Sequence, residues 1–177
     1  MSTITSNEET TSHQRAEGMF RELLYIHALL RKDLTTVARL ACEAQEGLSP
    51  EKIVAEIRNL ETNSPLWQLK FGCMHYCRFV HTHHSIEDYA VFPMVRKHDP
   101  SLNSVVDRLE ADHLKVHDIT ERIIAAADRV PQDASGISRF ELVNALSDLE
   151  VHLLEHLNFE EKSLGPLLST WDSWPAD

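Results

Sequence analysis

The sequence predicts an all-α fold, namely an up-down-up-down antiparallel four-helix bundle with one short extra helix. Apolar residues recur at helical spacing through most of the 177 residues, and no β-branched run alternates between turn signals as a strand would. The chain contains only 5 Gly and 7 Pro, which argues against a loop-rich or all-β fold. Long helices joined by short connections are typical of such bundles.

The N-terminal third of the chain predicts a tail, one long helix and one short helix. Residues 1–12 are rich in Ser, Thr and Glu and carry too few apolar residues to form a core, so a disordered tail is expected. From about residue 12 apolar residues follow a helical period up to Gly47, which is a plausible stop. Ser49 and Pro50 suit the N-cap and first position of a short helix ending near residues 62–65.

Three further long helices follow. The second is expected over residues 66–97, with Pro93 kinking it or ending its regular part. A turn at 99–101 leads to the third, over about 102–130, and a loop at 131–136 leads to the fourth, over about 138–168. The bundle domain would thus span residues 13–170, followed by a C-terminal tail at 171–177 that either packs back or is loose.

The charge and cysteine content of the chain limit the partners and the cellular compartment that can be expected. The net charge is -11 and no basic stripe is present, so nucleic acid and anionic membrane surfaces are poor partners. No segment reaches the roughly 18 to 20 apolar residues of a membrane span, and residues 1–12 are not a secretory signal. Three cysteines, an odd number without framework spacing, suit a reducing compartment and predict a cytoplasmic location. Cys73 and Cys77 share one helix face, which favours core packing over a redox pair.

Histidine placement indicates a metal site. The chain has 11 histidines, and seven His and Glu residues follow a regular pattern: His27 within an apolar stretch, then the pairs His83 and Glu87, His113 and His117, and His156 and Glu160. The members of each pair are four residues apart, so they project from one helix face. Imidazole and carboxylate groups are ligands that iron takes from proteins.

The second and fourth long helices carry the same motif near their C-terminal ends. His83–Pro93 and His156–Pro166 both fit H-x-x-x-E-[DE]-x-x-x-[FG]-P. In an up-down bundle these two helices run in the same direction, while the first and third run oppositely. The patterned residues of all four helices are therefore expected to converge on one layer of the core.

The order H, H-x-x-x-E, H-x-x-x-H, H-x-x-x-E resembles that of the hemerythrin-like, or HHE cation-binding, family in its bacterial stand-alone form, over about residues 15–170. The resemblance implies an oxo- or hydroxo-bridged centre of two Fe ions. Its terminal ligands would be His27, His83, His113, His117 and His156, and its bridging carboxylates Glu87 and one glutamate of the fourth helix. This set fills about eleven of roughly twelve coordination positions and leaves one open for a small ligand.

Either of two glutamates could be the fourth-helix carboxylate. The repeat with the second helix favours Glu160, whereas the H-x-x-x-x-D spacing of oxygen-carrying hemerythrins falls on Glu161. The longer carboxylate and altered spacing argue against plain reversible oxygen carriage.

The remaining histidines are not expected to be ligands. His81 and His84 lie off the face of His83 and suggest outer or supporting roles, and His152 is the reserve candidate one turn before His156. Surface or packing positions are expected for His13, His75 and His98. Tyr76 is either a core residue or a hydrogen-bond donor into the site, and Asp88 and Asp112 could steady ligand histidines from outside.

The resemblance implies a protein that binds O2, peroxide or NO at the open iron position, with catalase- or peroxidase-like turnover in defence against oxidative or nitrosative stress and an unidentified reductant. The alternative is a non-catalytic oxygen or iron binding, storage or sensing module. A ferritin-like di-iron site needs Glu-x-x-His on two helices, and only Glu110 and His113 have that spacing. The H-E-x-x-H string of zinc proteases is absent.

Overall fold

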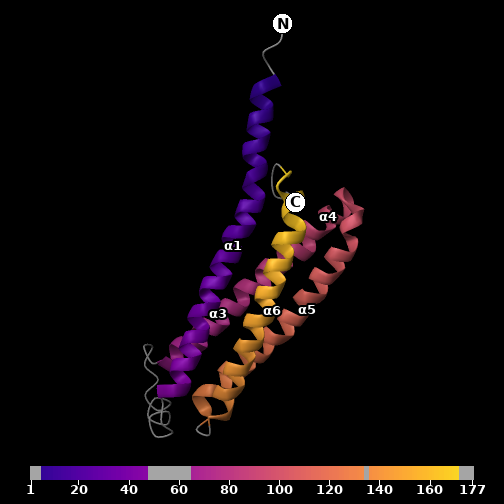
Figure 1. The fold of residues 1–177 in the computed structure, drawn as a ribbon. Helices are drawn as coiled ribbons and strands as arrows, with labels where there is room; N and C mark the ends of the chain where they lie inside the picture. Colours follow the sequence, from indigo (N-terminus) through magenta and orange to yellow (C-terminus); the bar gives the residue numbers. More distant parts are fainter. Residues whose placement is uncertain (1–4, 48–64, 134–135, 172–177) are drawn as a thin grey trace.

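The fold is a four-helix bundle in a computed structural model that describes residues 5–47, 65–133 and 136–171. Its long helices are α1 (Thr5–Gly47), α3 (Pro65–Ile86), α5 (Asn103–Arg129) and α6 (Ile137–Leu168). Successive helices run in opposite directions (Figure 1), and each packs against two others, in the cyclic order α1, α3, α5, α6. The predicted fold is therefore confirmed. The short helix expected after Ser49 lies outside the described residues.

The first and last described segments of the chain bear on the two predicted tails. Helix α1 begins at Thr5, so residues 5–12 are helical where the sequence predicts a disordered tail, and residues 1–4 lie outside the described part. This segment contains no Gly or Pro, the residues that most disfavour a helix interior. At the C-terminal end of the described chain Trp171 is only 8% exposed and packs into the core, which agrees with the alternative that the tail packs back, while residues 172–177 lie outside the described part.

The second long helix continues past Pro93 through a wider turn. Helix α3 passes into a π-helical segment, Glu87–Val91, and then into α4 (Phe92–His98). The backbone N–H of Phe92 donates to the carbonyl oxygen of Glu87, five residues earlier. Pro93 cannot donate, and its ring crowds the preceding turn of a regular α-helix, so a π-turn accommodates it without ending the helix. The irregularity begins at Glu87, one of the predicted metal ligands.

Short helical turns make the remaining connections. The 3₁₀ turn Pro100–Leu102 joins α4 to α5, and the side chain of Asp99 accepts a hydrogen bond from the backbone N–H of Ser101 at 3.0 Å. A second 3₁₀ turn, Val130–Gln132, follows α5. Both turns keep consecutive helices adjacent, which fixes the up-down order of the bundle.

A polar layer divides the apolar core into two clusters. The cluster on the α4 side comprises Met19, Leu23, Val91, Phe92, Val95, Val106, Leu109, Leu164, Leu168 and Trp171. The larger cluster, on the opposite side, includes Leu30, Val80, Val116, Ile123 and Leu149. On each long helix the buried His and Glu residues occur between positions that belong to the two clusters. The predicted convergence on one layer therefore follows from the helix directions.

Two cysteines belong to the larger cluster. Cys73 and Cys77 are both buried, and burial raises the pKa of each thiol to about 12. A thiol with such a pKa stays protonated at neutral pH and is a poor nucleophile or metal ligand. The buried positions agree with the predicted core role.

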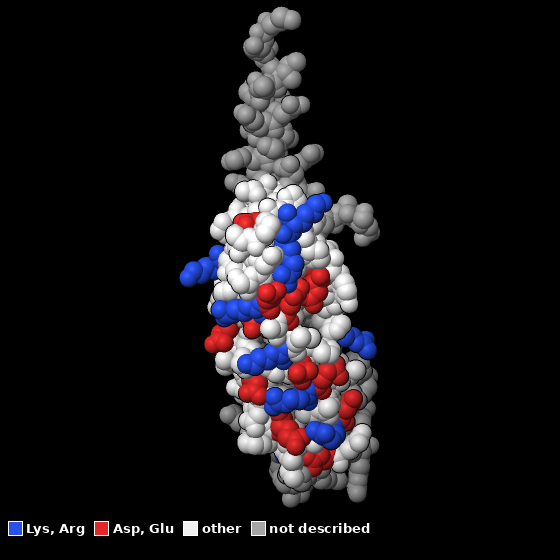
Figure 2. Space-filling view, turned by 90° about the vertical axis from the view of Figure 1, so that its right-hand side faces the viewer, with Lys and Arg blue, Asp and Glu red and all other residues white. Residues whose placement is uncertain are grey.

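The surface carries interleaved charges. Figure 2 shows acidic and basic side chains alternating over one face of the molecule. Exposed ion pairs such as Arg96–Asp107 at 2.7 Å and Arg122–Asp148 at 3.0 Å contribute little stability each, because water and salt screen them. Within the described ranges, none of the helices combines the length and hydropathy that a transmembrane span requires.

Candidate metal centre

The polar layer contains two groups of buried side chains, each with four possible metal ligands. The first group is His84, Glu87, His113 and His156, and the second is His27, His83, Glu87 and Glu160. Within each group the potential ligand atoms all lie within 4.8 Å of one another. Glu87 is common to both groups, so the arrangement has the form of two adjacent sites that share a carboxylate.

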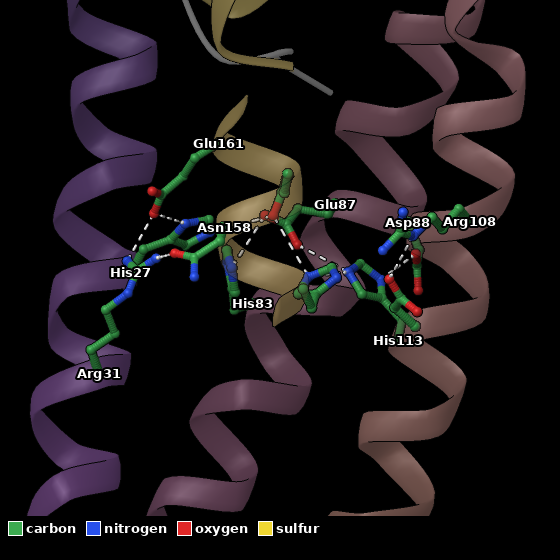
Figure 3. A network of polar contacts seen from close by, with 12 residues as sticks. His27, Arg31, His83, Glu87, Asp88, Arg108, His113, Asn158 and Glu161 are labelled. Atoms are coloured by element: carbon green, nitrogen blue, oxygen red, sulfur yellow. Dashed lines mark hydrogen bonds and ion pairs between the residues drawn. The ribbon is translucent and has the colours of Figure 1, made fainter. Parts of the chain in front are cut away.

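Glu87 connects the two groups through its two oxygens. Its Oε1 lies 3.2 Å from Nε2 of His83, and its Oε2 lies 3.4 Å from Nε2 of His113. These imidazoles belong to different groups and come from different helices (Figure 3). A carboxylate that faces one imidazole with each oxygen has the geometry needed to bridge two cations.

Glu160 contacts histidines of both groups as well. Its Oε2 lies 3.4 Å from Nε2 of His27 and 3.6 Å from Nε2 of His156. The Nε2 of His156 also lies 3.2 Å from Nε2 of His113. Glu160 is fully buried, so of the two fourth-helix glutamates it is the one that the structure places inside the cluster.

Glu161 occupies the opposite side of His27. Its Oε1 lies 2.8 Å from Nδ1 of His27 and accepts a hydrogen bond from Nη1 of Arg31, also at 2.8 Å. Arg31 in turn donates to Asn158 at 2.9 Å. A carboxylate on Nδ1 fixes the orientation of the ring and leaves Nε2 free to face the cluster.

Asp88 acts on His113 in the same way. Its Oδ1 lies 2.7 Å from Nδ1 of His113, while Nε2 of this ring faces Glu87. This contact is the supporting role that the sequence suggested for Asp88. Asp112 instead lies 3.7 Å from the guanidinium of Arg108, and no contact between Asp112 and a cluster histidine is found in the described part of the chain.

The structure brings His84 into the cluster and leaves His117 outside both groups. His84 is 5% exposed, and its ring stacks on that of His113 with centroids 3.9 Å apart. This placement corrects the outer position expected for His84. His117 is half-buried, and its ring lies 5.1 Å from that of His81. The cluster thus contains five histidines and two glutamates, as predicted, but His84 takes the place predicted for His117.

Helix packing explains the exchange. Helix α3 packs against both α1 and α5, so it buries two adjacent stripes of side chains. His84 continues one of them, formed with Cys73, Cys77 and Val80 at intervals of three or four residues. This run was the sequence signal that could have identified His84. On α5 the buried stripe passes from His113 to residues 116 and 120, which leaves His117 at its edge.

Three of the cluster histidines, His83, His84 and His156, are held in the neutral form. Burial lowers the pKa of His83 and of His156 from 6.5 to about 3 and lowers that of His84 well below 6.5. At neutral pH each of these rings keeps a lone pair on one nitrogen, which is the state that binds a metal.

The pKa values of the two buried glutamates shift in opposite directions. Burial raises the pKa of Glu87 well above its usual range, and the adjacent Glu160 raises it further. Burial also acts to raise the pKa of Glu160, but the close approach of its carboxylate to the imidazoles of His27, His156 and His83 outweighs burial and lowers the pKa to about 2. Two carboxylates this close resist joint ionisation, and a bound cation would favour the ionised form of both.

Unsatisfied polar atoms converge on the same place. Most buried side-chain N and O atoms without a hydrogen-bond partner in the described part of the chain belong to the cluster: Nε2 of His27, His83 and His84, Nδ1 of His156, and both carboxylate oxygens of Glu87 and Glu160. Each such atom costs about 1–3 kcal/mol when buried without a partner. Cations in the cluster would satisfy these donor atoms, apart from Nδ1 of His156, because the Nε2 of that ring is the nitrogen that faces Glu160 and His113. A set of imidazole nitrogens and carboxylate oxygens fits iron, manganese or zinc.

Tyr76 lies elsewhere. Its hydroxyl donates to the backbone carbonyl of Leu30 at 3.1 Å, and burial raises its pKa. The hydroxyl proton is therefore committed to α1, so of the two alternatives for Tyr76 the structure agrees with core packing and not with donation into the site.

The other histidines lie outside both groups. His152 is half-buried and lines a pocket of about 60 Å³ beside His156, and His75, His81 and His98 are exposed. The side chain of His13 lies outside the described residues.

Besides the small pocket beside His156, two larger pockets reach the cluster from different sides. One of about 200 Å³ lies between α3 and α5 and extends to His84 and His113. The other, of about 310 Å³, lies between α1 and α3, is lined by Ile26, Phe79 and Ile86, and extends to His83 and Glu87. Each group of ligands is thus accessible from its own side.

Comparison with known proteins agrees with this geometry. The family model described as the hemerythrin HHE cation binding domain matches residues 10–168. Comparisons with curated proteins and with solved structures gave no match.

Proposed function

Because the chain belongs to the hemerythrin HHE cation-binding family, we propose that its buried cluster holds two Fe ions and that the loaded protein binds O2, peroxide or NO. The observation that carries the proposal is the pair of four-ligand groups that share Glu87. Two adjacent sites with a common carboxylate suit a pair of cations better than one. A pair of iron ions supplies a two-electron redox couple, which peroxide disproportionation requires.

The residues around the cluster have separable tasks. His84, His113 and His156 would hold one cation, His27 and His83 the other, and Glu87 and Glu160 would hold the two at a fixed separation. Glu161 and Asp88 orient two of the rings by contacts to Nδ1. The layer is enclosed by apolar clusters on both sides, which restricts access of water and strengthens the electrostatic interactions inside it.

Access to the cluster supports a small ligand. The pocket between α1 and α3 is bordered mainly by apolar side chains and ends at His83 and Glu87. Its walls suit an apolar diatomic molecule such as O2 or NO, whereas the pocket between α3 and α5 offers histidines and Asp88 and suits peroxide or water. Small molecules could thus approach from either side.

Non-catalytic binding, storage or sensing is the second candidate function. It is favoured by the position of Tyr76, whose hydroxyl bonds to a backbone carbonyl and so supplies no proton to the cluster. Turnover of peroxide would then depend on protons from the cluster carboxylates or from water. We favour catalase-like turnover in stress defence over non-catalytic binding, because the full ligand set and two access routes are present together.

The proposal is tested by iron content and by reaction with peroxide and NO. The purified chain should contain two irons and evolve O2 from hydrogen peroxide or consume NO. Glu87→Ala should lower iron well below two per chain because it removes the ligand common to both groups, whereas Glu150→Ala, an exposed change on α6, should not. Two irons retained in Glu87→Ala would refute the site, and two irons without turnover would leave the binding function.

A further inference from the structure

His117 and His81 remain outside the cluster, although the sequence pattern and the structure draw attention to both. His117 belongs to the H-x-x-x-H motif yet lies in neither ligand group. His81 is exposed on the adjacent helix. The two rings face each other across the α3–α5 contact, with centroids 5.1 Å apart and planes inclined by 57°.

We infer that His81 and His117 form an outer binding site for a divalent transition-metal cation, at the entrance of the pocket that leads to the buried cluster. Two imidazoles on one tetrahedral cation, with metal–nitrogen distances of about 2.0–2.1 Å, have ring centroids roughly 5 Å apart. The observed separation needs no rearrangement of the helices. Imidazole ligands select Zn²⁺, Cu²⁺, Ni²⁺ or Fe²⁺ over Mg²⁺ and Ca²⁺.

The contacts of each ring leave a nitrogen for the cation. Ser85 donates its hydroxyl proton to the backbone carbonyl of His81 at 2.8 Å, and its Oγ lies 3.5 Å from Nδ1 of the same residue. That oxygen can only accept from Nδ1, which favours the tautomer with a lone pair on Nε2. In His117, Nδ1 is buried and has no hydrogen-bond partner among the described residues.

The position of His81 and His117 indicates what a cation bound there would do. The pocket of about 200 Å³ is lined by His81 and His117 and also by His84 and His113 of the cluster. Asp88 lines the same pocket and adds negative charge. A cation held at the outer pair would therefore lie in the same pocket as His84 and His113 of the cluster. The route to the cluster rests on the proposed metal centre, whereas binding at the outer pair does not.

Zinc binding to the iron-loaded chain tests the outer site. After equilibrium dialysis against Zn²⁺ at neutral pH, the unaltered chain should hold one zinc in addition to its iron. His81→Asn and His117→Asn should each abolish that zinc and leave the iron content unchanged. His75→Asn is the matched control, since His75 is exposed on the same helix but does not line the pocket.

The rate of iron uptake tests the route. Stopped-flow mixing of the metal-free chain with limiting Fe²⁺ should show uptake slowed on the order of tenfold in both pocket variants, because a charged or ligating cleft raises the local concentration of its ion. Zinc binding equal in all four proteins would overturn the outer site. Loss of iron in His117→Asn alone would also overturn it, by making His117 a ligand of the buried pair. Zinc held by the outer pair in a chain that binds no iron would support this site while refuting the proposed function.

Discussion

The contact between Glu161 and His27 gives a direct test of how the cluster is organised. Glu161→Ala removes the acceptor of two contacts of 2.8 Å, one with Nδ1 of His27 and one with Arg31. His27 is fully buried, so its ring would lose the group that sets its tautomer and orientation. The Nε2 atom that faces Glu160 would then be free to rotate away or to carry a proton.

The magnitude follows from the burial of the pair. A hydrogen bond to a charged group contributes about 1.5–3 kcal/mol, and Glu161 is 22% exposed, so values near the lower end apply. Since about 1.4 kcal/mol corresponds to a factor of ten, iron affinity should fall by roughly tenfold, at the lower end of the usual range of about 10- to 100-fold for a carboxylate that supports a ligand histidine. Glu161→Gln keeps a carbonyl acceptor and should lose less.

Competition with a coloured iron chelator measures this affinity. The matched control is Glu150→Ala, because Glu150 is exposed on the same helix. A purely structural role would lower the stability of the metal-free chain as much as it lowers iron affinity, so urea denaturation of the metal-free variants is measured in parallel. Iron affinity unchanged in Glu161→Ala, or a loss equal to that in the control, would refute the reasoning.

Two further predictions concern stability. In the metal-free chain, His83 and His156 have a pKa of about 3 and His84 a pKa well below 6.5, so the unfolded state binds more protons than the folded state between pH 6.5 and about 3. The free energy of unfolding should therefore fall as the pH drops from 6.5. The protons taken up by three imidazoles on unfolding outnumber the one released by Glu87, the buried carboxyl with a raised pKa. A melting temperature higher at pH 5 than at pH 7 would contradict this. Gly165→Ala should lower the free energy of unfolding by about 1–2 kcal/mol, because the new Cβ would lie 2.7 Å from the Phe20 ring and overpacking outweighs the gain in helix propensity. Urea denaturation checks this change, and the loss should shrink in a Phe20→Leu background.

The periodicity of the sequence determined the fold and most of the cluster. Four long amphipathic helices with short connections leave an up-down bundle as the compact arrangement. Within it, the i, i+4 spacing of His83 with Glu87 and of His156 with Glu160 places each pair on one helix face, since helical geometry alone sets that relation. Because the motif is repeated on two helices that run in the same direction, both pairs lie in the same polar layer of the bundle.

Tertiary packing decided what local spacing leaves open. Whether His84 or His117 enters the cluster depends on how α3 and α5 rotate about their axes, and that rotation is set by the apolar residues of all the neighbouring helices. The contacts of Glu161 with His27 and of Asp88 with His113 join residues on different helices, so no spacing within one helix predicts them. The π-turn at Glu87 likewise required a helix that packs on both sides of Pro93 and therefore continues through it. The sequence by itself thus determined the helices, their order and the kind of ligands, whereas the structure decided which side chains meet, because that depends on rotations and distances between helices.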